Sequence, residues 1–191
     1  MRLLAGLAAT ALLIGACGGA PATTAASASP TATVAPTPTP SPTPQTKFVF
    51  NADLKSSNEV PAITSPEASC AGKGVFTLNT TKDGTGKITA ATAQFDLTIT
   101  GCPTTTEIIL FHIHKQVAGQ NGSVVVDSGQ KNTEPIALTT GATAGTITKM
   151  QPTVKPEDAE AIIAGPDGFY FNVHSKLHGG GVIRGQLTKG S

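Results

Sequence analysis

The sequence predicts an all-β domain, a β-sandwich or barrel with one short helix, preceded by a signal peptide and a disordered Pro/Thr-rich stalk. Two observations predict the fold. Short runs rich in β-branched and aromatic residues recur along the second half of the chain, and Gly or Asn-Gly turn signals separate them at the spacing of a sandwich or barrel. In the longest run Phe95, Leu97 and Ile99 alternate with polar residues, as in a strand with one buried face.

Residues 1–16 are predicted to be a lipoprotein signal peptide. Arg2 supplies the positive charge, and the apolar run Leu3–Ala16 is shorter than the roughly 20 residues that a membrane span requires. Small residues precede Cys17, which resembles the lipobox of bacterial lipoproteins. This resemblance implies cleavage before Cys17 and lipidation of its thiol, so that the mature protein is anchored to the cell membrane or cell surface, outside the cytoplasm. The alternative is an ordinary signal peptide with an incidental cysteine.

Residues 17–46 are predicted to form a linker. The segment contains no charged residue, and seven of the 14 prolines lie between Pro21 and Pro44, mixed with Thr, Ser and Ala. Such a composition cannot bury a core and favours extended polyproline conformers. We therefore expect a semi-rigid stalk that holds one domain, residues 47–189, away from the membrane.

The elements of this domain follow from its local patterns. Strands are expected at Val75–Leu78, Lys87–Thr100, Glu107–His114, Ser123–Asp127, Gly145–Lys149, Phe169–Ser175 and Val182–Thr188. A helix is expected to begin at Pro156, since proline suits the first helical position and the acidic Glu157 and Asp158 favour the positive end of the helix dipole. Gly165 suits its end.

The net charge argues against nucleic-acid binding, and the cysteine content predicts a disulfide. Removing Arg2 with the signal peptide leaves 12 basic and 12 acidic residues, so the mature chain is near neutral and nucleic acid is not an expected partner. Beyond Cys17, the cysteines are Cys70 and Cys102, and in an oxidising compartment an even pair most simply forms a disulfide. The turn at Asp83–Gly84 would bring the two together. The alternative is a cysteine ligand for a metal.

Three of the four histidines are candidate metal ligands. His112 and His114 are two residues apart, so both rings project from the same face of a strand, and a neighbouring strand could bring His174 beside them. Histidine is the commonest metal ligand in proteins. The alternative is a hydrogen-bonded polar cluster of these histidines with Tyr170, Asn172 and Arg184. No Ser/His/Asp or Cys/His set can be assigned, so the sequence predicts no catalytic residue.

Several motifs together resemble the chordin-type (CHRD) domain, over about residues 47–189. They are Ser57–Ala62, His112–His114, Asn121–Gly122, Asn172–His174 and Gly181–Leu187, in matching order and spacing. The resemblance implies an extracytoplasmic all-β domain, which occurs in animal chordin and in many bacterial secreted proteins of unassigned role. The growth-factor binding of chordin does not carry over to a bacterial lipoprotein.

A fainter resemblance is to copper/zinc superoxide dismutase, which implies a Greek-key sandwich or barrel. It implies copper ligands at His112, His114 and His174, and an anion-guiding arginine at Arg184. The histidine that bridges copper and zinc has no counterpart, since no His lies between His114 and His174, and the zinc loop is absent. What remains is a three-histidine copper site with an open position, for which His178 is either a further ligand or a loop residue.

Two functions are therefore expected to compete. The first is a non-catalytic, lipid-anchored surface module that binds an extracellular protein or matrix partner, with a three-histidine metal site as an added feature. The second is a copper-binding protein with redox chemistry resembling that of superoxide dismutase, in which case it would be an oxidoreductase. A hydrolase acting on cell-wall polymer is a third class, but the sequence lacks a paired-carboxylate motif.

Overall fold

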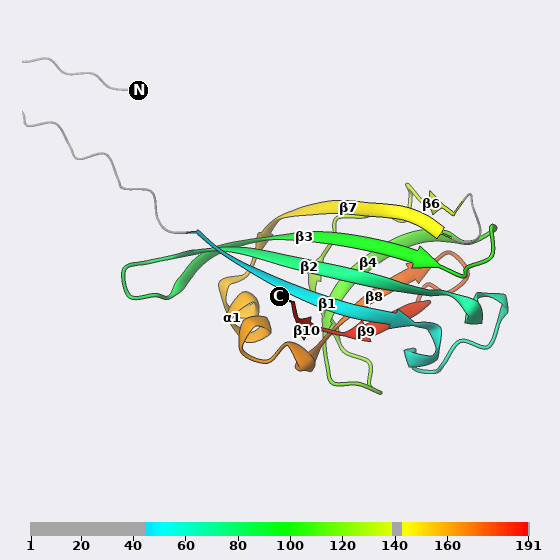
Figure 1. The fold of residues 1–191 in the computed structure, drawn as a ribbon, viewed down its shortest axis with the longest axis horizontal. Helices are drawn as coiled ribbons and strands as arrows, with labels where there is room; N and C mark the ends of the chain where they lie inside the picture. The colour runs from blue at the N-terminus through cyan, green and yellow to red at the C-terminus, as the bar shows by residue number, and fades with distance from the viewer. Residues whose placement is uncertain (1–44, 139–142, 191) are drawn as a thin grey trace, which may run out of the picture. The chain divides into compact units, whose positions relative to one another are not determined.

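A computed structural model describes residues 45–138 and 143–190 of the protein (Figure 1). The expected signal peptide, Cys17 and the linker up to residue 44 lie outside the described residues. Among the described helices, none is long and apolar enough to cross a membrane. Strand β1 begins at Gln45, two residues before the expected start of the domain.

A single antiparallel sheet forms the domain and curls into a nearly closed barrel. Its strands are β1 (Gln45–Lys55), β2 (Ala71–Lys82), β3 (Ile88–Thr100), β4 (Glu107–Lys115), β5 (Ser123–Asp127), β6 (Ile136–Ala137), β7 (Thr143–Val154), β8 (Phe169–Ser175), β9 (Ile183–Gln186) and β10 (Thr188–Lys189). The strand order is β5-β4-β8-β9-β1-β2-β3-β7, while β6 pairs with β4 and β10 with β1. The predicted all-β barrel or sandwich class is confirmed.

Strands β1, β2 and β3 form a meander that supplies much of the core (Figure 1). A chain of aromatic contacts crosses that core from the meander to the far strands, through Phe50, Phe76, Phe95, Phe111 and Phe171. Most of these rings meet edge to face or tilted, the arrangements that the ring quadrupole favours. This apolar cluster ties β4 and β8 to the meander.

Strand β1 is missing from the sequence prediction. Its signal is present, since Phe48, Phe50, Ala52 and Leu54 occupy alternate positions, and all but Phe48 are fully buried. This alternating pattern lies directly after the Pro/Thr-rich linker, where no strand is predicted from the sequence. The first predicted strand, Val75–Leu78, is the middle of the longer β2.

The predicted helix is confirmed as α1 (Pro156–Ala164), with Pro156 in its first turn and Gly165 as its C-cap. Ala159 and Ile162 are its buried residues, and α1 packs against β3 at one end of the meander (Figure 1). The short 3₁₀ helix η3 (Pro166–Gly168) then leads into β8.

A bulge in β4 changes which of its residues face the core. The pairing of β4 with β8 shifts register between Ile108 and Leu110. Strict alternation along this strand would place Ile109 on the same face as Phe111 and Ile113, but Ile108 is the residue that is fully buried in the core. An inserted residue reverses the alternation on one side of a bulge, which explains the difference. Beyond the bulge the predicted alternation holds.

A disulfide joins Cys70 and Cys102, as predicted. Cys70 precedes β2 and Cys102 follows β3, and the two strands pair so that Ala71 lies opposite Thr100. Gly101 connects the end of β3 to Cys102. It has a positive φ of 71°, and a Cβ there would lie 2.5 Å from the backbone oxygen of Ser69, so no larger residue fits.

Replacing both cysteines with alanine is expected to lower the free energy of unfolding by roughly 3–4 kcal/mol, since the bridge closes a loop of 32 residues and restricts the unfolded chain. The urea midpoints of the double variant and of the oxidised protein measure the difference. An unchanged midpoint would show that the bridge contributes nothing to stability.

Candidate metal centre

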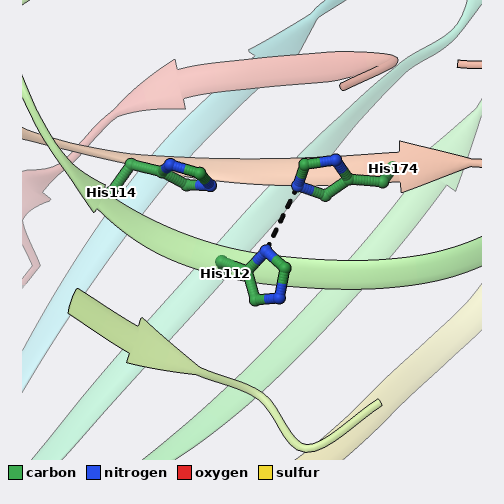
Figure 2. A group of neighbouring side chains, drawn as sticks. All are labelled: His112, His114 and His174. Atoms are coloured by element: carbon green, nitrogen blue, oxygen red, sulfur yellow. Dashed lines mark hydrogen bonds between the residues drawn. The ribbon is translucent and has the colours of Figure 1, made fainter. Parts of the chain in front are cut away.

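The pairing of β4 with β8 brings the three predicted histidines together (Figure 2). In the register of these strands His112 lies opposite Asn172, His114 opposite Tyr170, and His174 opposite Leu110. Each of the three histidines offers a nitrogen within 4.8 Å of those of the other two. The rings are buried, with exposed fractions of 6–8%. The described part of the chain therefore contains one compact three-histidine cluster that could hold a metal ion.

Two of the rings have their tautomer fixed by backbone carbonyls. Nδ1 of His114 lies 2.9 Å from the oxygen of Gly122, and Nδ1 of His174 lies 3.0 Å from the oxygen of Gly179. A carbonyl can only accept, so both Nδ1 atoms must donate, and both Nε2 atoms carry lone pairs. Nε2 of His114 is buried and has no hydrogen-bond partner. A buried acceptor without a partner is costly, and a metal ion would satisfy it.

The third ring turns its other nitrogen toward the cluster. Nδ1 of His112 lies 3.2 Å from Nε2 of His174, and its Nε2 lies 3.8 Å from Oδ2 of Asp127 on β5. Without metal, Nδ1 must donate to the lone pair of His174. If the proton moves to Nε2, facing the Asp127 carboxylate, Nδ1 is freed as a ligand. A carboxylate beside the outer nitrogen is a common partner of a metal-bound histidine.

Burial favours the neutral form of all three rings. Desolvation is the largest cause that lowers the pKa of His112 and of His114 from the usual value. The pKa of His174 is lowered to about 4, by burial first and by the neighbouring His112 second. At neutral pH the three imidazoles are therefore uncharged, which is the form that binds a metal.

Tyr170 forms a wall of the cluster. Its ring stacks on that of His114 with centroids 4.9 Å apart, and its hydroxyl accepts a hydrogen bond from the Gly122 N–H at 3.1 Å. The guanidinium of Arg184 lies 4.8 Å from the centre of the same ring, within cation–π range. The residue thus supports both the His114 ring and the loop that carries its carbonyl partner.

Arg184 lies in a polar network and is only 3% exposed. It donates to Glu59 Oε2 at 2.8 Å, to the Gln120 oxygen at 3.0 Å and to Asn121 Oδ1 at 2.6 Å. Burial raises the pKa of the Glu59 carboxyl, and the charge of Arg184 opposes that shift. Of the two roles considered for Arg184, this geometry matches the polar network, since its charge is paired and its donors on all three nitrogens are engaged.

Asn172 is also part of this buried polar layer. Its side chain is 2% exposed, and its Oδ1 has no hydrogen-bond partner. Asn172 and Glu59 both lie against Gly181, where a Cβ would come within 2.8 Å of each side chain. Gly181 is thus required for close packing beside the cluster.

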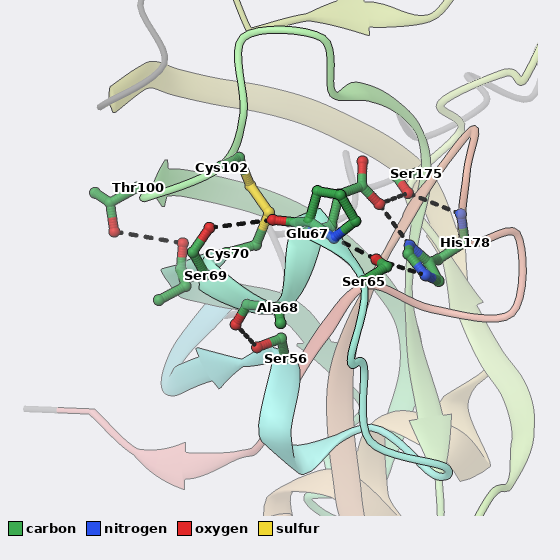
Figure 3. The surroundings of a disulfide bond; sticks show 12 residues. Ser56, Ser65, Glu67, Ala68, Ser69, Cys70, Thr100, Cys102, Ser175 and His178 are labelled. Carbon is green, nitrogen blue, oxygen red and sulfur yellow. Dashed lines mark hydrogen bonds and ion pairs between the residues drawn. A yellow bond between two sulfur atoms is a disulfide. The ribbon is translucent and has the colours of Figure 1, made fainter.

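His178 lies outside the three-histidine cluster, in the loop after β8 (Figure 3). Its Nδ1 lies 2.5 Å from Glu67 Oε2, and its Nε2 lies 3.2 Å from Ser65 Oγ. Ser65 Oγ also accepts the Glu67 N–H as the cap of the 3₁₀ helix η2 (Pro66–Ser69), so these contacts join the loop after β8 to the helix that begins beside Ser65. Of its two expected roles, His178 takes that of a loop residue.

Sequence reasoning missed the residues that orient the histidines. Asp127, Gly122 and Gly179 contact the outer nitrogens, and Glu59 and Glu67 hold Arg184 and His178. Glu59 stands within the motif Ser57–Ala62, which gave it prominence but no role. Gly122 likewise stands within the motif Asn121–Gly122, which assigned it no role. Glu67 carries no local signal, since its contact with His178 joins segments 111 residues apart.

Comparison with known proteins identifies a family. A family model described as CHRD domain matches residues 50–187, which covers the sheet from β1 to β9 and all three histidines. No curated protein and no solved structure matches the chain.

The metal-free protein is expected to lose stability as the pH falls from about 6.5 to about 4. In that window the unfolded chain binds a proton at His174 and the folded chain does not, so protonation favours unfolding. The loss attributable to this residue is at most about 3 kcal/mol. Urea unfolding at several pH values should give a shallower slope for His174→Gln, and equal slopes would contradict the assignment.

The variant Arg184→Met is expected to lower the free energy of unfolding by about 3–5 kcal/mol, because it leaves the Glu59 carboxylate buried without its partner. Lys73→Met is the matched control, since it removes an ion pair of similar length, at 2.9 Å, between side chains that are largely exposed. Urea midpoints should shift for Arg184→Met and stay unchanged for the control. Equal shifts would refute a structural role for the buried pair.

Proposed function

Since the chain belongs to the CHRD-domain family, we propose that it is an extracytoplasmic, lipid-anchored protein whose β domain binds one copper ion through His112, His114 and His174. The observation that carries the proposal is the convergence of three buried imidazoles. His114 and His174 donate their outer Nδ1–H to backbone carbonyls, and the outer Nε2 of His112 lies 3.8 Å from the Asp127 carboxylate. The ligand atoms would be Nδ1 of His112 and Nε2 of the other two.

The chemistry of the donor set favours copper. Imidazole suits copper, zinc, nickel and iron, and for a given site the affinity of divalent first-row metals is highest for copper. The cluster contains no carboxylate within its inner face, since Asp127 lies on the outer side of His112. Three neutral nitrogens leave at least one coordination position open for water or a further ligand.

Two features support a location outside the cytoplasm. The Cys70–Cys102 disulfide fits an oxidising compartment, where such bridges persist. The lipobox-like sequence before Cys17 supports the lipid anchor, and the Pro/Thr-rich linker supports a stalk between anchor and domain. These inferences rest on sequence and compartment chemistry.

Metal binding, rather than turnover of superoxide, is the function that the surroundings of the cluster support best. An arginine that guides an anion needs free charge at the surface, whereas Arg184 is buried and paired with Glu59. No fourth histidine among the described residues joins the cluster, because His178 is bound to Glu67. A binding or buffering role requires neither feature.

The first test is a copper titration of the secreted chain carrying Cys17→Ser, which retains the stalk and the domain but cannot be lipidated. We expect one copper per chain, and at least about tenfold weaker binding in His114→Ala, since that variant removes one of three ligands. His178→Asn is the matched control, because it removes an imidazole outside the cluster while keeping a donor for Glu67.

Equal affinity in His114→Ala and in the unsubstituted chain would remove His114 from the ligand set. Absence of stoichiometric copper, zinc or nickel binding in the unsubstituted chain would refute the metal-binding proposal. The domain would then be a surface module whose histidines form a hydrogen-bonded cluster.

A further inference from the structure

The loop between β8 and β9 controls the orientation of His174. The Gly179 carbonyl accepts the Nδ1–H of His174 at 3.0 Å, which directs Nε2 toward the cluster. Gly179 and Gly180 are adjacent, and a Cβ at either would meet no atom within 4 Å. No atom therefore packs where a side chain would project from these two positions, and glycine gives this part of the loop high conformational freedom.

His178 is the residue on which this loop closes. Its backbone oxygen accepts from the N–H groups of Ser175 at 3.3 Å and Gly181 at 3.1 Å, and its own N–H donates to Ser175 Oγ at 2.9 Å. Its ring points away from the loop, with Nδ1 beside Glu67 Oε2 and Nε2 beside Ser65 Oγ (Figure 3). The residue that precedes Gly179 and Gly180 is therefore held by hydrogen bonds of both its backbone and its side chain.

Glu67 is a rigid anchor for that ring. The side chain is 4% exposed, and its Oε2 accepts from Ser175 Oγ at 2.6 Å as well as from His178. Its backbone oxygen accepts the N–H of Cys70 at 3.0 Å, and Cys70 itself forms the disulfide to Cys102. The acceptor for His178 is thus held by the covalent link between the ends of β2 and β3.

We propose that the hydrogen-bonded pair His178–Glu67 is a latch that positions His174 for metal binding. Closing the loop on Glu67 places the Gly179 carbonyl, the carbonyl fixes the tautomer and the ring angle of His174, and Nε2 is thereby presented to the metal. His178 and Glu67 are positioning residues, since neither touches the metal. The inference rests on the proposed function and adds that copper affinity depends on a contact outside the ligand set.

The test compares three variants of the secreted chain with Cys17→Ser. His178→Ala opens the latch, and we expect about tenfold weaker copper binding with an altered Cu(II) EPR spectrum, as for loss of an outer partner of a metal-bound histidine. His178→Asn keeps a donor at the position of Nδ1 and should restore both. Lys176→Ala is the matched control, because it removes an ion pair from the same loop, to Glu107 at 2.9 Å, without touching the latch.

A second measurement needs no metal. In the metal-free protein the His174 Nδ1–H is buried and hydrogen-bonded, so its imidazole proton should give a slowly exchanging NMR resonance. This resonance should be lost in His178→Ala and retained in His178→Asn and Lys176→Ala.

The two readouts separate the possible failures. If the unsubstituted chain binds copper and His178→Ala binds it equally well with the same EPR spectrum, the latch is wrong and the metal site stands. If the unsubstituted chain binds no metal, the proposed function fails, and the NMR resonance alone decides whether the latch holds His174. Retention of the resonance in His178→Ala would then overturn the latch.

Discussion

The antiparallel pairing of β4 with β8 is the constraint on which the candidate metal centre depends. In this register Ile113 faces Phe171 and Phe111 faces Val173 within the apolar core, and the histidines lie on the opposite face. A slip of one residue would place imidazoles in the core and phenyl rings in the polar layer. The aromatic contacts that bind both strands to the meander therefore also hold the register that assembles the three histidines.

Each of the two loops beside the cluster is held through a side chain that pairs with a buried glutamate. The loop that carries Gly122 is tied through Gln120 and Asn121 to Arg184, which pairs with Glu59. The loop that carries Gly179 is tied through His178 to Glu67. Both glutamates come from the segment between β1 and β2. That segment carries the disulfide at its end (Figure 3). It therefore secures the carbonyls that orient His114 and His174.

Local patterns were sufficient to predict much of this arrangement. Period-two alternation gave most strands and the shared face of His112 and His114, and proline with two acidic residues gave the start of α1. Alternation cannot reveal a bulge such as that beside Ile108, since the extra residue is set by the partner strand. It also cannot pair Glu59 with Arg184 or Glu67 with His178, which are more than 100 residues apart. The residues that anchor the two loops could therefore be identified only from the structure.

The electrostatics of the cluster set how readily its three rings take up protons. Protons and metal ions compete for the same imidazole lone pairs, and burial lowers the pKa of all three rings. Protons are therefore poorer competitors here than at exposed histidines. A metal ion gains coordination bonds from three nitrogens at once, whereas a proton satisfies at most two. The same desolvation that disfavours an imidazolium thus leaves the three lone pairs available to a metal ion under mildly acidic conditions. The charge of Arg184, although paired with Glu59, lowers the pKa of His114 and of His174 further.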